Sequence, residues 1–356
     1  MSATPAGVFK NGTISSYYNY DKLYSYNGIY NFAVGGRGIG KTYGAQKKTI
    51  KAALEKGEQF MYVRRYKDEL KLSRDTYFDA VAVEFPEWDF RTQGLFAHAA
   101  PASTRDDKKR PWQVIGYFVA LSQQQQIKSV AFPKVHTIIY DEFIIEKGSI
   151  HYISNEAISF QNLYSTVDRY QGRVRVLFLA NSVSMDNPYF IHYKIRPDQS
   201  GEWLRLRFDP DTGLPFIVVH FIESEAFTSE VFATRFGKFI QGTEYAEYAV
   251  GNEFADANDN LVAFKPSHAK YEYSVETVSG IFSVWIDWNG PYYYMQEKRP
   301  KEEKLFTVLT QKMREGKTLL VPSDKLLQAL RTAFRNGNAY FDSPRARNAF
   351  IEIFKR

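Results

Sequence analysis

Short apolar blocks separated by polar, glycine-containing turns run along the first half of the chain. The blocks are rich in β-branched and aromatic residues and too short for helices, which predicts buried strands at 30–34, 59–65, 136–143 and 173–180. The stretch 43–56 consists of good helix formers and ends at Gly57, so a helix is expected there. Strands and helices in alternation indicate an α/β fold with a parallel sheet.

A polar stretch at 99–113 lies between two further strand-like blocks, 90–96 and 114–120, and predicts a protruding hairpin. Basic residues gather near its tip, at Lys108, Lys109 and Arg110. They could contact nucleic acid or simply be solvated loop charges, and the sequence leaves both interpretations open.

The hydrophobic pattern changes near residue 223. A charged, helical pattern runs to 252, and beyond 255 the blocks 274–278, 281–288 and 291–297 alternate as strands, with helical patterns at 326–334 and 346–355. Asn289-Gly290 between two of these blocks is a strong hairpin signal. The pattern therefore predicts three parts: a first domain at 1–222, a helical linker segment at 223–254 and a small α/β domain at 255–356.

A complete phosphate-loop motif follows the first predicted strand. It reads G-x-x-x-x-G-K-[ST] and comprises Gly35, Gly36, Arg37, Gly38, Ile39, Gly40, Lys41 and Thr42. Backbone N–H groups of such a loop surround the phosphates of a nucleotide, the Lys reaches the β- and γ-phosphates, and the Thr hydroxyl ligates magnesium. A nucleoside triphosphate with Mg²⁺ is the expected ligand.

Two adjacent carboxylates, Asp141 and Glu142, end the predicted strand at 136–143. At the carboxyl end of a parallel strand, Asp141 can hold the magnesium ion, and Glu142 can accept a proton from the attacking water. Asp141 lies 100 residues after Lys41, which leaves room for the helix after the loop and two further strand–helix units. Asn181 follows another strand and is expected beside Lys41, and the two arginines that end block 59–65 are expected on the same edge. The motifs together indicate a magnesium-dependent ATPase.

Composition narrows the class of protein without identifying a partner. The chain has 356 residues, enough for about two domains, and no apolar run approaches the roughly 20 residues that span a bilayer, so no membrane association is expected. It has no Cys, which excludes disulfides and thiolate metal sites and fits a reducing cytoplasm. The first twenty residues lack the pattern of a secretory signal. A net charge of +6 favours an anionic partner.

The ordered set of motifs resembles one family. The phosphate loop, the block 58–66, Ile139 to Phe143 and Gly242-Thr243-Glu244-Tyr245 are similar to the double-stranded DNA packaging ATPases of small protein-primed tailed phages, the phi-twenty-nine type. The resemblance runs from about residue 20 to the end. It implies a P-loop NTPase domain of the additional-strand, catalytic-Glu type. It also implies an ATP-driven motor that moves double-stranded DNA into a preformed capsid.

The resemblance also implies roles for individual residues. Lys41 and Thr42 match the phosphate-binding pair, Asp141 the magnesium-holding carboxylate and Glu142 the catalytic base. Arg169 matches an arginine finger given to the neighbouring subunit, and Lys128 a second basic position that reaches the neighbour; Arg173 is a reserve candidate. The implied partners are a homo-oligomeric ring, usually a pentamer, the portal and a structural RNA. The implied location is the prohead portal vertex in the host cytoplasm.

The C-terminal part resembles an RNase H-like nuclease fold. Metal-dependent cleavage needs clustered carboxylates. Only Asp287 lies in a clear strand, with Asp324 and Asp342 as possible companions in loops, so a vestigial nuclease that contacts nucleic acid or the portal is expected. The alternatives are a terminase-like nuclease with an accessory ATPase, a helicase or translocase with the same core, and a nucleotide-gated docking protein.

Overall fold

The chain forms two compact units. The computed structural model describes residues 18–145, 152–153, 155–181, 187–195, 202–223, 225–243, 246, 264–290, 292–297, 299–301, 304–309, 317–335 and 338–354. The first unit contains the described residues from 18 to 181 and from 194 to 246, and the second contains 187–193 and those from 264 onward. The exact domain boundaries of the sequence analysis stay a prediction, since residues 247–263 lie outside the described part.

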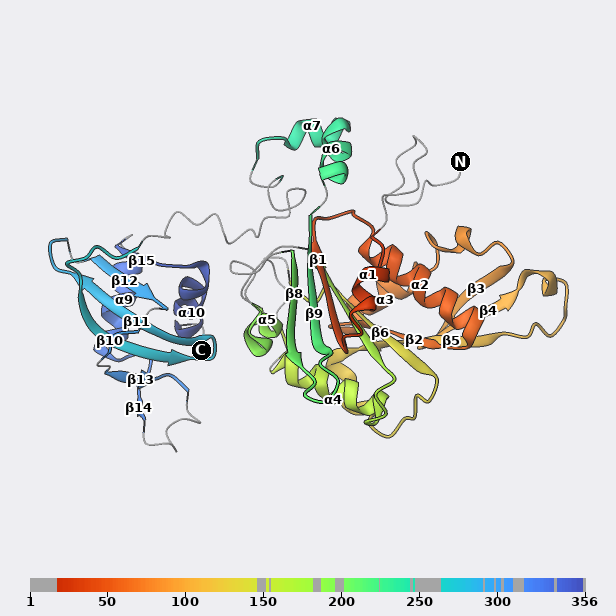
Figure 1. Cartoon of the computed structure of the whole chain (residues 1–356), viewed down its shortest axis with the longest axis horizontal. Helices are drawn as coiled ribbons and strands as arrows, with labels where there is room; N and C mark the ends of the chain where they lie inside the picture. Colours follow the sequence, from red (N-terminus) through yellow and green to blue (C-terminus); the bar gives the residue numbers. More distant parts are fainter. Residues whose placement is uncertain are drawn as a thin grey trace. The chain divides into compact units, whose positions relative to one another are not determined.

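One mixed sheet organises the first unit (Figure 1). Among the described residues it has nine strands in the order β3-β4-β5-β2-β6-β7-β1-β9-β8. In chain order these are β1 (Tyr30–Gly35), β2 (Gln59–Arg64), β3 (Trp88–Gln93), β4 (Phe96–Pro101), β5 (Gln113–Ala120), β6 (Val135–Asp141), β7 (Arg175–Asn181), β8 (Trp203–Phe208) and β9 (Pro215–Ile222). The central strands from β5 to β9 are parallel, and every residue of β1 is buried, as expected for a strand covered on both faces.

Helices and aromatic side chains cover the two faces of this sheet. The helical elements are α1 (Asp21–Ser25), α2 (Lys41–Lys56), α3 (Lys67–Asp75), α4 (Glu156–Asp168) and the short η1 (Ala82–Glu84), η2 (Ala102–Thr104) and η3 (Leu121–Ile127). One core joins α1, α2 and α3 to the sheet, and α2 contributes Tyr43, Ile50 and Ala53 from a single stripe. Phe160 of α4 packs on two aromatic residues of the sheet, Tyr140 and Phe178, with ring centroids 5.3 and 4.7 Å apart.

The segment between β2 and β6 contains the predicted hairpin, formed by β4 and β5, but its strand bounds differ from the prediction. Block 90–96 is not one strand, because Gly94 adopts a positive φ of 61° and reverses the chain between β3 and β4. The stretch 99–113 is not all loop either, since its beginning belongs to β4, which pairs antiparallel with β5. A β-hairpin therefore takes the place of the second strand–helix unit expected between Lys41 and Asp141. In the loop between β4 and β5, Arg110 is held by Asp89 at 2.7 Å, whereas Lys108 and Lys109 are exposed.

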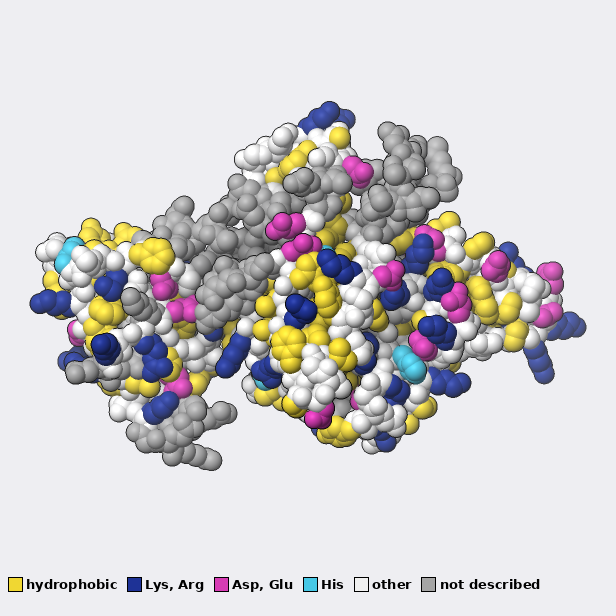
Figure 2. All heavy atoms as spheres, viewed as in Figure 1, with side chains coloured by type: hydrophobic (Ala, Val, Ile, Leu, Met, Phe, Trp, Pro, Cys, Tyr) yellow, Lys and Arg dark blue, Asp and Glu magenta, His cyan; other side chains and the backbone are white. Residues whose placement is uncertain are grey.

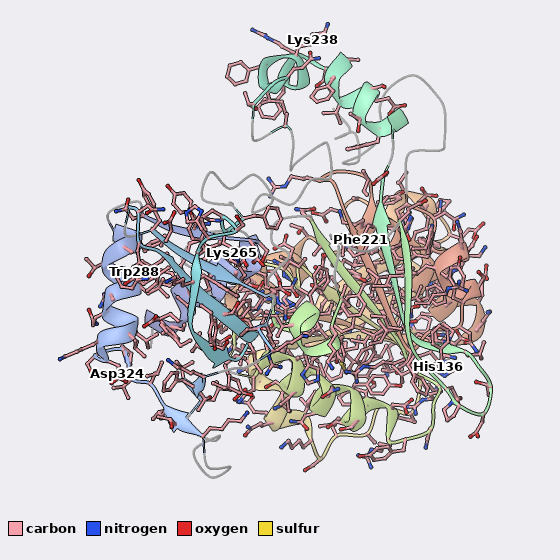
Figure 3. The ribbon with its side chains drawn as sticks, turned by 60° about the vertical axis from the view of Figure 1, so that its left-hand side comes forward. His136, Phe221, Lys238, Lys265, Trp288 and Asp324 are labelled. Carbon is pink, nitrogen blue, oxygen red and sulfur yellow. The ribbon has the colours of Figure 1, made fainter. Side chains whose placement is uncertain are left out.

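The predicted helical linker contains two short helices, α6 (Glu225–Ala233) and α7 (Arg235–Ile240). Thr234 separates them and caps α7, because its hydroxyl accepts a hydrogen bond from the Gly237 amide. Lys238 is exposed on α7 (Figure 3). The end of the predicted segment, up to residue 254, lies outside the described residues.

The second unit contains a smaller sheet with helices on one face. Its strands are β10 (Lys270–Thr277), β11 (Gly280–Asp287), β12 (Tyr292–Gln296), β13 (Leu305–Thr307), β14 (Thr318–Leu319) and β15 (Ala339–Phe341), in the order β14-β13-β10-β11-β12-β15. The helices that pack on this sheet are α9 (Lys325–Arg335) and α10 (Pro344–Phe354), and the unit also includes α5 (Pro188–Tyr193). The core gathers Val275 and Val284 of the sheet with Leu327 and Leu330 of α9 and Phe350 of α10. The RNase H-like assignment of this unit stays a prediction.

The three carboxylates proposed as nuclease remnants have separate local partners. Asp287 lies 3.0 Å from His268 Nε2, Asp324 accepts from the Val321 amide at 2.6 Å, and Asp342 accepts from the Glu297 amide at 2.9 Å. In the described residues no three His, Cys, Asp or Glu side chains form a group that could hold a metal ion. None of the helices in that part combines the length and apolar character needed to cross a lipid bilayer. Lys and Arg are spread over the face of both units drawn in Figure 2.

Candidate nucleotide-binding site

The candidate site lies at the carboxyl edge of the parallel strands. Because β1, β6 and β7 run in the same direction, the phosphate loop, Asp141 and Asn181 all emerge at this edge. Figure 3 shows the direction: His136 near the start of β6 and Phe221 near the end of β9 lie toward opposite edges.

The phosphate loop joins β1 to α2 through two glycines with left-handed backbone conformations. Gly38 has φ 93° and Gly40 has φ 78°, values that disfavour a side chain. Lys41 begins α2 and turns back into the loop, where its Nζ donates to the carbonyls of Gly35 at 3.0 Å and Gly36 at 2.8 Å. It also donates to Asn181 Oδ1 at 3.2 Å, which places Asn181 beside Lys41 as predicted. Burial lowers the pKa of Lys41 to about 7.

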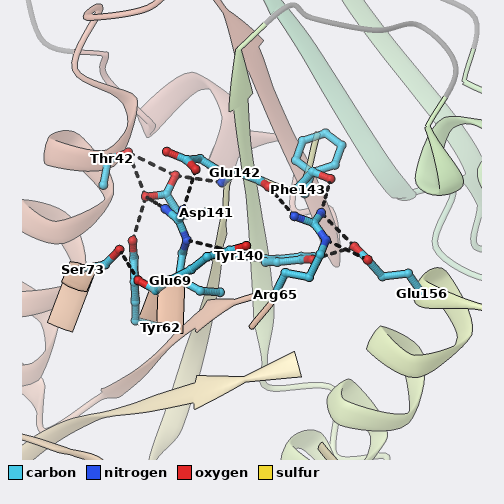
Figure 4. Close-up of polar contacts among 11 residues, drawn as sticks. Thr42, Tyr62, Arg65, Glu69, Ser73, Tyr140, Asp141, Glu142, Phe143 and Glu156 are labelled. Atoms are coloured by element: carbon cyan, nitrogen blue, oxygen red, sulfur yellow. Dashed lines mark hydrogen bonds and ion pairs between the residues drawn. The ribbon is translucent and has the colours of Figure 1, made fainter. Parts of the chain in front are cut away.

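Asp141 ends β6, and its carboxylate accepts hydrogen bonds from two hydroxyl groups (Figure 4). The Thr42 hydroxyl lies 3.2 and 3.1 Å from its two carboxylate oxygens, and the Tyr62 hydroxyl donates to Oδ2 at 2.9 Å. Burial raises the pKa of this carboxyl group. Both proposed magnesium ligands, Thr42 and Asp141, are therefore in direct contact, whereas Tyr62 was not foreseen from the sequence.

Glu142 follows Asp141 in an uncommon backbone conformation, with φ 55°. This turn directs its side chain away from the strand, and 61 % of the side chain is exposed. Its carboxylate pairs with Arg64 at 2.5 Å, and Arg64 also lies 4.0 Å from Asp141. The two motif carboxylates thus differ in environment: Asp141 is enclosed, and Glu142 can reach a water molecule at the edge of the sheet.

A buried ion pair fixes the backbone that carries Glu142. Arg65 and Glu156 are 2 % and 1 % exposed and form two hydrogen bonds of 2.8 and 2.9 Å. Arg65 also donates to the carbonyls of Glu142 and Phe143, at 3.3 and 2.7 Å, while the Tyr140 hydroxyl donates to Glu156 at 2.7 Å. Figure 4 shows Arg65 between the strand end and α4. This network holds the turn after β6 without any ligand.

Removing the charge of Glu156 is expected to destabilise the fold. Glu156→Gln leaves the Arg65 guanidinium buried without a counter-ion, which costs about 3–5 kcal/mol of unfolding free energy. The measurement is urea-induced unfolding of the full chain. Glu55→Gln is the matched control, because the Glu55 pair with Lys51 is exposed and spans 3.8 Å, so its loss should cost less than about 1 kcal/mol. Equal stability of the two variants would contradict the structural role of the pair.

The residues present fit a nucleotide with Mg²⁺. Among the described residues no carboxylate lies within ion-pair distance of the buried Lys41 amine, which faces backbone carbonyls, so an anionic phosphate group would complete its environment. Thr42 and Asp141 supply hard oxygen ligands, which Mg²⁺ prefers. Two such ligands are enough for magnesium, since it usually keeps waters and substrate phosphates in its shell.

The first linker helix contacts the phosphate loop. A Cβ atom placed on Gly38 would lie 3.3 Å from the ring of Phe227 in α6. Phe227 is buried and belongs to the same core as α2. This contact was not predicted, because it joins residues of two different predicted parts of the chain.

Arg169 and Lys128 lie away from this site. Arg169 caps the end of α4 and is exposed, and its guanidinium donates to the Val130 carbonyl at 3.3 Å. Lys128 follows η3, which packs against α4, and is also exposed. Arg169 precedes β7, whose far end carries Asn181 beside Lys41. Seven strand residues span about 20 Å, so neither the strand nor the turn brings Arg169 to its own phosphate loop.

Together, the parallel sheet, the phosphate loop and the Asp-Glu pair define a P-loop nucleotide-binding protein. A model of the podovirus DNA encapsidation protein (Gp16) family matches residues 13–356, and the chain belongs to this family. The DNA packaging protein of Bacillus phage phi29 is 36% identical over 347 residues, which cover 96% of this chain and 98% of that protein. The DNA packaging protein of Bacillus phage B103 is 34% identical over 337 residues, 94% and 99% of the two chains.

Solved structures agree with this family membership. The chain is similar to a subunit of the phi29 viral genome packaging motor assembly, with a TM-score of 0.70, 35% identity and coverage of 96% and 99%. The N-terminal domain of the phi29 DNA packaging ATPase covers 60% of this chain and all of its own length, with a TM-score of 0.50 and 38% identity. The family and the P-loop fold predicted from the motifs are confirmed, and the chain is a viral DNA-packaging protein of this family.

Proposed function

We propose that this chain is the subunit of a ring-shaped motor that hydrolyses ATP to move double-stranded DNA into a preformed capsid. The observation that carries the proposal is the convergence of Lys41, Thr42 and Asp141 at one sheet edge, with Glu142 directed outward beside them. This arrangement occurs in a member of a DNA encapsidation family.

Each residue has a defined part in the proposed hydrolysis. Lys41 binds the β- and γ-phosphates, and Thr42 and Asp141 hold the magnesium ion. Bound magnesium would neutralise charge on the phosphate oxygens. Glu142 orients the attacking water and accepts its proton, for which its carboxylate must leave Arg64. Arg65 keeps the backbone of Glu142 in place throughout.

The proposal assigns Arg169, and with it Lys128, to the neighbouring subunit's site. Arg169 is exposed and its own phosphate loop lies beyond the length of β7, so the nearest phosphate it can serve belongs to another copy. Arg173, the reserve candidate, donates to the Phe132, Val167 and Asp168 carbonyls and is part of the fold. A ring, with a pentamer as the working number, follows from this donation in trans. We further propose docking at the portal vertex in the host cytoplasm, with a structural RNA as part of the attachment site.

DNA is expected to stimulate ATP turnover in a salt-dependent way. Motors that grip phosphates release counter-ions, so stimulation by long double-stranded DNA should fall steeply between about 50 and 200 mM salt. The measurement is ATP turnover with and without DNA, with Glu142→Gln as the blank. Turnover indifferent to DNA at low salt would favour a docking protein. Strand separation would favour a helicase, and plasmid cleavage with Mn²⁺ would favour a nuclease.

A further inference from the structure

The turn at residues 168–174, between α4 and β7, has an unusual backbone. Arg169 and Tyr170 both adopt positive φ angles, 50° and 60°, and Gly172 follows with 67°. Two consecutive non-glycine residues in this region are uncommon, and such strain persists only where surrounding contacts impose it.

Two side chains, the buried Asp168 and the half-buried Arg173, impose this conformation. Asp168 is 2 % exposed, and its carboxylate accepts from the amides of Gly172, Arg173 and Val174 at 2.9, 3.0 and 3.0 Å. Arg173 donates in the opposite sense, to the carbonyls of Phe132, Val167 and Asp168 at 2.7, 2.9 and 3.0 Å. Charge-assisted hydrogen bonds of this kind are stronger than neutral ones, so the turn is rigid before any partner arrives.

The rigid turn presents Tyr170 almost completely to solvent. Its side chain is 94 % exposed, more than any other large hydrophobic residue in the described part of the chain. The neighbouring Arg169 donates to the carbonyl of Val130, whose side chain is 44 % exposed. That contact is a single hydrogen bond of 3.3 Å at the surface, so Arg169 can leave it at little cost.

We propose that Tyr170 is the docking anchor through which one copy of the chain seats Arg169 in the site of the next copy. The inference rests on the proposed donation of Arg169 in trans. The partner is a second copy, because Arg169 next to Tyr170 cannot reach the phosphate loop of its own chain and a rigid aromatic side chain is a typical interface anchor. Tyr170 is a positioning residue: it fixes where the neighbouring Arg169 arrives and does not itself touch the nucleotide.

A complementation experiment tests this proposal. The acceptor is the full chain with Arg169→Ala, which keeps its nucleotide site but cannot donate Arg169. The donor is the full chain with Lys41→Ala, which keeps Arg169 but has an inactive nucleotide site. ATP turnover is measured at a fixed acceptor concentration while the donor is titrated. Adding Tyr170→Ala to the donor should raise about tenfold the donor concentration that gives half-maximal turnover. The maximal turnover at saturating donor should stay within about twofold of that with the parent donor.

Two further donors make the result specific. Tyr170→Phe keeps the ring and should rescue turnover as the parent donor does, and Phe208→Ala, which removes an aromatic residue 54 % exposed at the end of β8, should cause no shift. An unchanged half-maximal concentration for Tyr170→Ala, or an equal loss with Tyr170→Phe, would overturn the anchor alone. If the parent donor rescues nothing, donation of Arg169 in trans is wrong, and the proposed function fails at that step.

Discussion

Lys41→Ala is expected to lower ATP turnover by about 100- to 1000-fold, the loss typical for removing one preorganised group that stabilises transition-state charge. The Lys41 amine is buried within the phosphate loop, between the Gly35 and Gly36 carbonyls and Asn181. No other Lys in the described residues is classed as buried, so no neighbouring lysine amine can replace it inside the loop. Steady-state turnover with saturating ATP and Mg²⁺ measures the effect.

The matched control is Lys48→Ala in the same helix. Lys48 pairs at the surface with Asp21 at 2.9 Å, and its removal should leave turnover within about twofold of the parent. Both changes replace a lysine of α2 by alanine, a better helix former, so neither is expected to weaken the helix through propensity. Substantial turnover in Lys41→Ala would show that the phosphate loop does not bind the hydrolysed nucleotide.

Glu142→Gln is expected to bind ATP but to hydrolyse it about 100- to 10,000-fold more slowly, the range attributed to general base catalysis. The amide keeps the size of the side chain but cannot accept the proton of water. ATP affinity should change little, since Lys41, Thr42 and Asp141 are retained. Equilibrium binding and single-turnover hydrolysis separate the two steps.

Glu84→Gln serves as the control for this variant. Glu84 is also partly exposed and paired with a cation, Lys47 at 2.7 Å, but it lies in η1 rather than at the end of β6. Its turnover should stay within about twofold of the parent. Loss of ATP binding in Glu142→Gln would mean that the substitution damages the loop, and unchanged hydrolysis would assign the base to another residue.

The sequence predicts those parts of the site that are encoded by adjacent residues. The phosphate loop requires glycine at fixed positions, and Asp141 and Glu142 follow a recognisable buried strand, so both motifs are visible without a structure. Arg64 lies at the edge where the sequence placed it, but the parts played by Tyr62 and Glu156 are different. Their roles depend on which strands become neighbours, and β2 pairs with β6 across about 75 residues of chain.

The fold is likewise predictable where it depends on neighbouring residues and not where it depends on contacts between distant segments. Strands β1, β2, β5, β6 and β7 and helix α2 lie where the hydrophobic pattern predicts them, because burial leaves a periodic pattern in the sequence. Helix α4 and strands β8 and β9 were not predicted. The β3–β4 hairpin was missed since one glycine, Gly94, reverses the chain within an apolar block. The sheet order and the packing of α6 on the loop depend on contacts that no single stretch of sequence contains.

The contact between Phe227 and Gly38 makes the phosphate loop and the first linker helix mechanically dependent. The ring occupies the space that a side chain at Gly38 would need, so a displacement of the loop toward α6 must push the helix or tilt the ring. The chain continues from α6 through α7 toward the second unit. Any change in the loop conformation at Gly38 therefore alters the packing of α6, the first element that follows the large sheet in the chain.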